Sequence, residues 1–390
     1  MENEVQTAEL WIFRFMCGFA LFSSISIALQ NVFLILSVTG LLYRLYLKHD
    51  DIKKALTIDK GLLYPFLAWV GAVVLSSIAS AEPIWSFRVF GDYFGYRMAG
   101  LFIVLIAIRE KERLLVLAKL VFLSLFIDGG FCIYNWLIHG QRTGGLIFYM
   151  SFAGMLSMGI PAFFATGLLV KAKQRPVFII GTLFLLIVAV ANSTRGMWLS
   201  VLITITAVII LAVQGIKKKI IICSVLGIIL LAGFTFIPGV QHRVNTITDL
   251  KVQSNSERLL LWTSACNMYR DNPVIGIGFG RFKKEYQEKY ILPEAKERNL
   301  GHAHSNVMQM VAECGTIGTV TFLFWWLSVT WVGIKKWLKT RKLAWLLFLA
   351  IITGLLLTGL TEYNLGNSQI TKTFWFALAC CLQWVRLNDK

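Results

Sequence analysis

Long apolar runs dominate this chain and recur along nearly its whole length. A helix needs about 20 apolar residues to cross the hydrocarbon core of a bilayer. Twelve stretches of roughly that kind lie at residues 11–29, 31–47, 61–80, 88–108, 114–138, 145–170, 177–192, 196–213, 219–237, 305–333, 343–361 and 370–386. Because a backbone inside lipid must satisfy its own hydrogen bonds, these runs predict an all-α, polytopic membrane protein with about 12 transmembrane helices.

The composition agrees with a membrane protein. Of the 390 residues, 57% are hydrophobic and 15% are charged, whereas soluble domains carry about 25% charged residues. The seven cysteines form no CxxC motif, so neither a disulfide framework nor a zinc ribbon is indicated. The net charge of +17 is compatible with a nucleic acid partner, but the basic residues gather in short runs between apolar segments, as in cytoplasmic loops.

Every second connection between the expected helices is rich in lysine and arginine. These residues are Lys48, Lys53, Lys54, Lys60, Arg109, Lys111, Arg113, Lys171, Lys173, Arg175, Lys217, Lys218, Lys219, Lys335, Lys336, Lys339, Arg341 and Lys342. Since such loops stay in the cytoplasm, both termini are expected there. The resulting divisions are helices 1–9 in residues 1–237, a helical periplasmic loop at 238–303, and helices 10–12 in 304–390.

The loop at 238–303 is expected to form a small helical cap. Ser256 can cap a helix from Glu257 to Arg270, and Asn272-Pro273 ends it. The expected apolar face of this helix consists of Leu259, Leu260, Trp262, Thr263, Cys266 and Tyr269.

Three glycines at 276, 278 and 280 follow that helix. Their spacing is similar to a phosphate-binding loop, but no strand and helix flank them as a dinucleotide site requires. A tight bend is therefore predicted, followed by a second amphipathic helix from Arg281 to Ile291.

His304 lies where the polar loop meets the next apolar run. An imidazole there can accept a proton from a hydroxyl near neutral pH, although it could equally cap or solvate the start of the helix. His302 and His304 could also bind a metal together with His242 or Glu297. Structural and catalytic zinc sites need three or four protein ligands, and no third ligand has the required spacing, so no metal site is predicted.

Two arginines and one carboxylate stand out elsewhere. Arg195, in Asn192-Ser193-Thr194-Arg195-Gly196, lies at the outer end of an expected span, where arginine is costly and usually has a partner. Its planar guanidinium suits phosphate or carboxylate, and the alternative is an anchor at the head-group level. Arg258 opens the first loop helix. Asp128 lies inside an expected span and has no assigned role.

The region around His304 resembles the O-antigen ligase family. The family signature is His, then Asn, Ser or Gln, nine residues, Gly, two residues, and then Gly, Thr or Tyr. Here it consists of His304, Ser305, nine residues from Asn306 to Cys314, Gly315, two residues and Gly318. Residues 192–200 and 256–318 resemble the family in detail. O-antigen polymerases and bacterial protein O-oligosaccharyltransferases share the signature loosely.

The resemblance implies a glycosyltransferase of GT-C type in the bacterial inner membrane, with a periplasmic active site and no cofactor. The donor would be a glycan on undecaprenyl pyrophosphate, and the acceptor a sugar hydroxyl of lipid A–core. It implies that Arg195 and Arg258 bind the pyrophosphate and that His304 lies beside the reacting hydroxyl. Because fixed guanidinium groups can stabilise the departing pyrophosphate without a metal, we hypothesise an inverting, metal-independent transfer with His304 as catalytic base. His302, Ser305 and Gly315 would be supporting residues.

Three alternatives remain at this point. A polymerase or a protein O-oligosaccharyltransferase would differ in the acceptor alone. A transporter of lipid-linked glycans would be expected to carry paired repeats and charges near the midplane, whereas the polar residues here concentrate in one outer loop. The expected partners are the lipid-linked donor, the lipid A–core acceptor and membrane lipids, and no nucleic acid.

Overall fold

The computed structural model describes residues 2–48, 52, 57–140, 142–236, 241, 244–246, 249 and 252–388, and the regular structure in these ranges is helical. The all-α prediction is thereby confirmed. The α-helices are α1 (Glu2–Leu21), α2 (Ile27–Leu47), α4 (Lys60–Ile78), α5 (Pro83–Phe90), α6 (Ala99–Ala107), α7 (Lys111–His139), α8 (Tyr149–Leu169), α9 (Arg175–Asn192), α10 (Arg195–Ala212), α11 (Ile216–Phe236), α13 (Gln253–Asp271), α14 (Phe282–Glu285), α15 (Asn306–Thr340), α16 (Leu343–Thr358) and α17 (Ser368–Asn388). Short π- or 3₁₀-helices are η1 (Gly91–Tyr96), η2 (Ala172–Gln174), η3 (Tyr286–Tyr290) and η4 (Asn364–Gly366).

The described part of the chain contains eight helical segments that are long and apolar enough to cross a membrane. They are Ile27–Leu47, Lys60–Ile78, Pro83–Ala107, Lys111–His139, Tyr149–Leu169, Ala172–Asn192, Arg195–Ala212 and Asn306–Thr340. The protein is therefore a polytopic membrane protein. The other four expected spans lie on α1, α11, α16 and α17, which are not among these eight, so the count of about 12 stays a prediction.

One face of α15 carries large apolar side chains that are left uncovered by the described chain. Val320, Phe324, Leu327 and Trp331 are each more than half exposed. Their spacing of four, three and four residues places them on one stripe of the helix. A soluble protein rarely exposes such a stripe, so this face of α15 suits contact with lipid tails.

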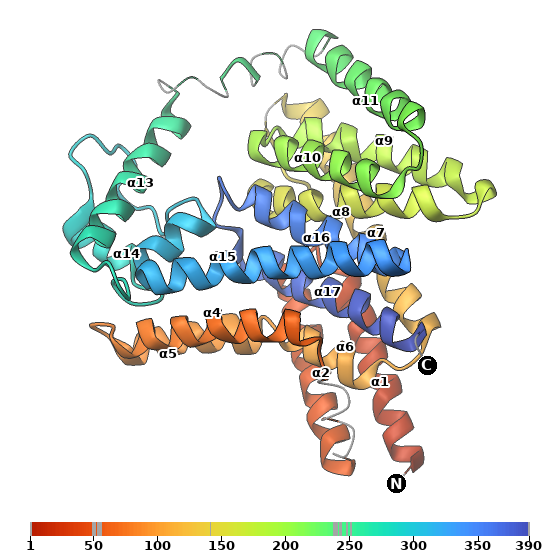
Figure 1. The fold of residues 1–390 in the computed structure, drawn as a ribbon, viewed down its shortest axis with the longest axis horizontal. Coiled ribbons are helices and arrows are strands. Elements are labelled where there is room, and N and C mark those ends of the chain that lie inside the picture. The colour runs from red at the N-terminus through yellow and green to blue at the C-terminus, as the bar shows by residue number, and fades with distance from the viewer. Residues whose placement is uncertain are drawn as a thin grey trace.

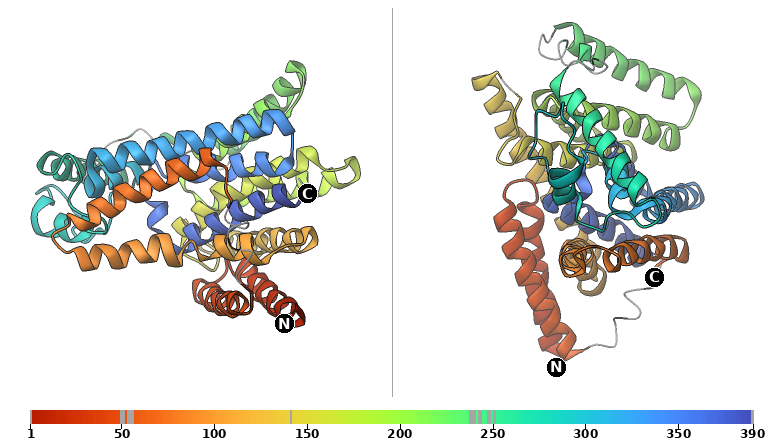
Figure 2. Two further views of the ribbon diagram at one scale, coloured as in Figure 1. Left: turned by 60° about the horizontal axis from the view of Figure 1, so that its bottom comes forward. Right: turned by 90° about the vertical axis from the view of Figure 1, so that its left-hand side faces the viewer.

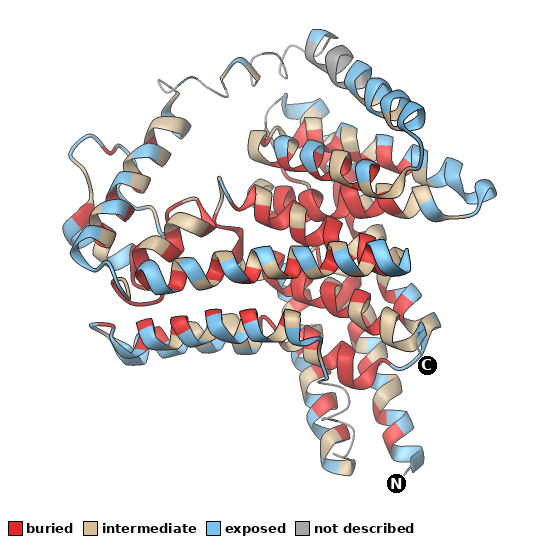
Figure 3. Cartoon of the chain, viewed as in Figure 1, coloured by how far each residue is buried: buried red, intermediate tan, exposed pale blue. Residues whose placement is uncertain are grey.

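Most long helices run side by side as a bundle, with the buried residues between them (Figures 1 and 3). α15 packs against α4, and α8 contacts α16, α9 and α10. α13 and α14 gather at one end of α15, whereas the α1–α2 hairpin projects from one side of the bundle (Figure 2). The cap is therefore attached to the bundle at the first turns of α15.

The first expected span, 11–29, is wrong in its boundaries. α1 ends at Leu21, a turn follows, and α2 begins at Ile27. Ser26 is the N-cap of α2, and its side chain accepts a hydrogen bond from the backbone N–H of Leu29. An N-cap serine starts a helix by satisfying one of its free N–H groups, so the apolar run 11–29 contains the end of one helix and the start of the next.

The cap helix α13 also differs from its prediction. It begins at Gln253, without a side-chain cap, and the Ser256 hydroxyl donates to the backbone carbonyl of Gln253 within the helix. The expected apolar face was wrong as well, because Leu259, Thr263 and Cys266 are exposed. The buried positions are instead Glu257, Leu261, Ser264, Ala265 and Met268.

The predicted second amphipathic helix corresponds to α14 and η3. Its apolar residues Phe282, Tyr286 and Tyr290 are buried. They form a small core with Leu261 and Met268 of α13, separate from the core of the bundle. The cap thus has its own apolar interior, which fixes α13 over the start of α15.

The segment with Gly276, Gly278 and Gly280 forms the predicted bend, and it supplies hydrogen-bond partners to the backbone where α15 is interrupted. Gly315 has φ 60° and ψ −154°, which interrupts the helix and leaves backbone groups without helical partners. The N–H groups of Ile277 and Gly278 donate to the carbonyls of Ala312 and Glu313 at 3.0 and 3.1 Å. On the other side of the break, Thr316 and Ile317 donate to the carbonyls of Pro273 and Val274.

Replacement of Gly315 should destabilise the protein. A Cβ atom there would lie 2.6 Å from the nitrogen of Gly276 and 2.7 Å from the carbonyl carbon of Val274. The backbone at Gly315, with φ 60° and ψ −154°, is one that essentially glycine alone adopts, and it adds about 1–3 kcal/mol for another residue. We expect Gly315→Ala to lower the melting temperature of the detergent-purified protein. Gly130→Ala is the control, because a Cβ atom at Gly130 meets nothing within 4 Å. Equal melting temperatures for the two variants would contradict this account of the break.

Candidate active site

His304 occupies a tight turn just before α15. Its φ of 47° is in the left-handed region, which is uncommon for a residue other than glycine and often marks a functional site. The side chain of Gln309 accepts the Ala303 N–H at 2.8 Å, and the indole of Trp262 donates to the Ala303 carbonyl at 3.0 Å. Both the cap and α15 therefore hold this turn in place.

The segment between α16 and α17 lies beside the same turn. The N–H of Asn306 donates to the Gly359 carbonyl at 2.7 Å, and its side-chain amide donates to Asn364 Oδ1 at 2.7 Å. A Cβ atom on Gly359 would lie 2.0 Å from the Asn306 side chain. This close approach brings Glu362 to the first residues of α15.

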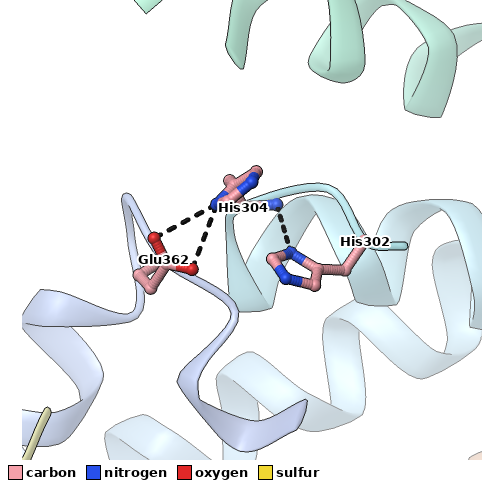
Figure 4. Close-up of side chains that lie close together, drawn as sticks. All are labelled: His302, His304 and Glu362. Carbon is pink, nitrogen blue, oxygen red and sulfur yellow. Dashed lines mark hydrogen bonds and ion pairs between the residues drawn. The ribbon is translucent and has the colours of Figure 1, made fainter. Parts of the chain in front are cut away.

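Glu362 and His304 form a hydrogen-bonded pair (Figure 4). Nδ1 of His304 lies 3.0 and 3.1 Å from the two carboxylate oxygens of Glu362. An ionised carboxylate can only accept hydrogen bonds, so the proton of a neutral imidazole belongs on Nδ1. Nε2 then carries the lone pair that can accept a proton from another group.

The charges around Glu362 keep it ionised. Burial alone would raise its pKa, but the hydrogen bond from His304 and the electrostatic influence of His304, His302 and Arg258 outweigh that effect and hold the pKa below its usual value. Arg258 Nη2 lies 3.6 Å from the Oε2 atom of the same carboxylate. One carboxylate thus orients both the imidazole and a guanidinium.

Arg195 and Arg258 line the same cavity, together with Glu362. Ser193 ends α9 in the left-handed conformation, Thr194 follows, and Arg195 is the first residue of α10. Its guanidinium donates to the carbonyl of Thr246, to Ser254 Oγ at 3.0 Å and to Asn255 Oδ1 at 2.8 Å. The Nε of Arg258 is buried and has no hydrogen-bond partner in the described residues, so a bound anion could satisfy it.

The structure thus brings together the three principal residues expected from the sequence. Arg195 and Arg258 share a cavity whose wall includes Glu362, and His304 contacts Glu362. Ser305 and Gly315 lie in the scaffold: Ser305 is the N-cap of α15 and accepts from the Met308 N–H, and Gly315 forms the break. Sequence reasoning missed Glu362, although it is the sole charged residue between the expected spans 343–361 and 370–386.

Comparison with known families agrees with this geometry. Residues 180–323 match the family model described as O-antigen ligase. The resemblance to the O-antigen ligase family is thereby confirmed over these residues. The match begins within α9 and continues through α10, α11 and the cap to the middle of α15, and so includes Arg195, Arg258 and His304. It indicates a multi-pass membrane enzyme for glycan transfer of the O-antigen ligase or polymerase type, acting on lipid-linked glycans. A comparison with curated proteins finds no match.

His302 has a structural role beside His304. Its Nδ1 accepts the backbone N–H of His304 at 3.3 Å, which stabilises the left-handed turn (Figure 4). Burial and then the nearby charge of His304 lower its pKa from 6.5 to about 4. His302 is therefore neutral near pH 7.

His302, His304 and Glu362 could also bind a metal ion, since one ligand atom from each lies within 4.8 Å of the others. The third ligand is Glu362 and neither of the two considered from the sequence. His242 lies outside the described residues, and the carboxylate of Glu297 accepts from Gln253 on the cap. The hydrogen bonds already made by Nδ1 of both histidines compete with a metal.

The stability of the protein should depend on the protonation of His302. The pKa of its imidazole is about 4 in the folded protein and 6.5 in a free side chain, so the unfolded chain takes up the proton first. The stabilisation is complete above pH 6.5 and is lost as the pH falls toward 4. We expect the melting temperature to fall less over this range in His302→Gln than in the wild type. His139→Gln, at an exposed position, should keep the full decline. An unchanged decline in His302→Gln would refute this assignment.

Chelation and zinc addition should have opposite effects on glycan transfer. EDTA should leave transfer unchanged if His304 acts through its Glu362 hydrogen bond. Added Zn²⁺ should inhibit, because it would compete for Nδ1 of His304 and for the Glu362 carboxylate, and His302→Gln should weaken that inhibition. Loss of transfer in EDTA with recovery on adding zinc would instead identify a metal centre.

Proposed function

We propose that this protein is an O-antigen ligase of the bacterial inner membrane, with both termini in the cytoplasm and the cavity open to the periplasm. It transfers a glycan from undecaprenyl pyrophosphate to a sugar hydroxyl of lipid A–core, with inversion and without a metal. The observation that carries the proposal is the cavity lined by Arg195, Arg258 and Glu362 with His304 hydrogen-bonded to Glu362.

The chemistry of the transfer accounts for these residue types. The acceptor hydroxyl attacks the anomeric carbon, the bond from that carbon to the pyrophosphate oxygen breaks, and the hydroxyl proton passes to Nε2 of His304. Attack opposite the leaving group inverts the anomeric centre. Negative charge develops on the departing pyrophosphate, and fixed guanidinium groups stabilise it. Arg195 and Arg258 can supply that charge in place of a metal.

Glu362 acts as a positioning residue in this mechanism. Its carboxylate keeps the proton on Nδ1 of His304 and stabilises the imidazolium that forms when Nε2 accepts a proton. The ion pair with Arg258 at 3.6 Å couples the base to the pyrophosphate site. A polymerase or a protein O-oligosaccharyltransferase could use the same arrangement with another acceptor, and no contact in the described residues favours either.

The proposal is tested by reconstituting the purified protein with an undecaprenyl-pyrophosphate-linked glycan and lipid A–core. We expect transfer by the wild type and a loss of about 100-fold or more in His304→Ala, because the general base is removed. Arg195→Ala and Arg258→Ala should each lose about tenfold or more, as expected for a charge-assisted contact. Glu362→Gln should lower turnover more than it raises the acceptor KM.

Arg270→Ala is the matched control, since Arg270 lies exposed in the last turn of α13 and its guanidinium donates to Asn267 of the same helix. It should transfer as the wild type does. Transfer to a second lipid-linked glycan in place of lipid A–core would identify a polymerase, and transfer to a protein Ser or Thr an oligosaccharyltransferase. Normal transfer by His304→Ala would remove the proposed base.

A further inference from the structure

A third arginine lines the cavity of Arg195 and Arg258. Arg142 lies in the connection between α7 and α8, outside the region that matches the O-antigen ligase family. This connection is expected on the periplasmic side, where the short connections carry few basic residues, whereas the long loop at 238–303 carries ten. Arg142 departs from this charge pattern and lines a cavity, so binding of an anionic ligand explains its position better than a role in orienting the protein in the membrane does.

The guanidinium of Arg142 is tied to the turn that carries Arg195. Its Nη2 donates to Thr194 Oγ1 at 2.9 Å and lies 3.0 Å from the sulfur of Met150. Its planar face lies over the Tyr149 ring at 3.9 Å. Thr194 in turn bonds Asn192 Oδ1 at 2.5 Å. These contacts place Arg142 and Arg195 on one wall of the cavity.

A carboxylate inside the bundle holds the connection that carries Arg142. Asp128 of α7 accepts the backbone N–H of Leu146, and a Cβ atom on Gly145 would lie 2.2 Å from the Asp128 carboxylate. Asn135 donates to the Gly145 carbonyl at 3.2 Å, and Asn192 donates to the Tyr149 carbonyl at 2.9 Å. These hydrogen bonds hold the connection against α7 and α9, and they explain why Asp128 lies inside the bundle.

The charges in the cavity match a diphosphate. Arg142, Arg195 and Arg258 contribute three positive charges, and Glu362 contributes one negative charge, which leaves two positive charges among the described lining residues. A pyrophosphate esterified at both ends carries two negative charges, whereas a phosphate diester carries one. A third planar guanidinium also adds a fork for two phosphate oxygens.

We propose that Arg142 is a third pyrophosphate-binding residue, positioned by the connection that Asp128 holds, and that it makes the site select a polyprenyl diphosphate over a polyprenyl monophosphate. This inference rests on the proposed function, because it assumes that the cavity receives the lipid-linked donor.

The experiment measures binding without transfer. Undecaprenyl pyrophosphate and undecaprenyl phosphate, each esterified to the same sugar, are titrated without an acceptor against the purified full-length protein in nanodiscs. We expect Arg142→Ala to raise the Kd for the pyrophosphate about tenfold or more and to change the Kd for the monophosphate much less. Arg142→Lys keeps the positive charge but loses the planar guanidinium, so its Kd for the pyrophosphate should lie between those of the wild type and Arg142→Ala. It also tests the inference if the alanine variant folds poorly. Arg270→Ala should bind as the wild type does.

The outcomes separate this inference from the proposed function. If the wild type does not bind the pyrophosphate, the proposed function fails. If Arg195→Ala weakens binding while Arg142→Ala and Arg142→Lys bind as the wild type does, the inference about Arg142 alone fails. Asp128→Asn should raise the Kd, and the double variant Asp128→Asn/Arg142→Ala should bind no more weakly than Arg142→Ala. Additive effects would show that Asp128 does not act through Arg142.

Discussion

The hydrogen bond between Glu362 and His304 joins two parts of the chain on which the whole site depends. One part is the turn before α15, and the other is the segment between α16 and α17. Both parts are largely irregular in structure, so each needs other contacts to hold its shape. Asn306 provides these by bonding Gly359, Asn364 and Leu365. The bundle thus fixes the carboxylate, the cap fixes the imidazole, and the pair forms where the two meet.

The spacing of the signature has a mechanical explanation. Ser305 starts α15 as its N-cap, and Gly315 breaks the helix ten residues later. At about 1.5 Å of rise per residue, this segment is roughly 15 Å long. The glycine bend at 276–280 supplies the backbone partners that the break requires. The signature therefore sets the distance between His304 and the break, and the same bend connects that break to the cap.

Much of the fold and part of the site could be predicted from the sequence. The apolar runs identified the helices, and the motif residues led to His304, Arg195 and Arg258, which the structure brings close together. The buried face of α13 could not be predicted, since apolar residues surround much of that helix and its partners come from α14 and α15. Glu362 was missed because its partner lies 58 residues away, and no local pattern records such a contact. The first span was misplaced because the apolar run continues through the short turn between α1 and α2.

Arginines that depart from the expected distribution of basic residues between the two sides of the membrane are informative about function. A membrane protein gains orientation from basic residues in cytoplasmic loops, so an arginine that lines a cavity in a segment expected on the other side calls for another explanation. Arg142, Arg195 and Arg258 come from three separate connections or helix starts and line one cavity. Like charges brought together repel each other, and one carboxylate offsets only part of that repulsion. Electrostatic interactions strengthen where water is scarce. An anion with two negative charges would therefore relieve the repulsion most, and the charges in the cavity are balanced only when such a ligand is bound.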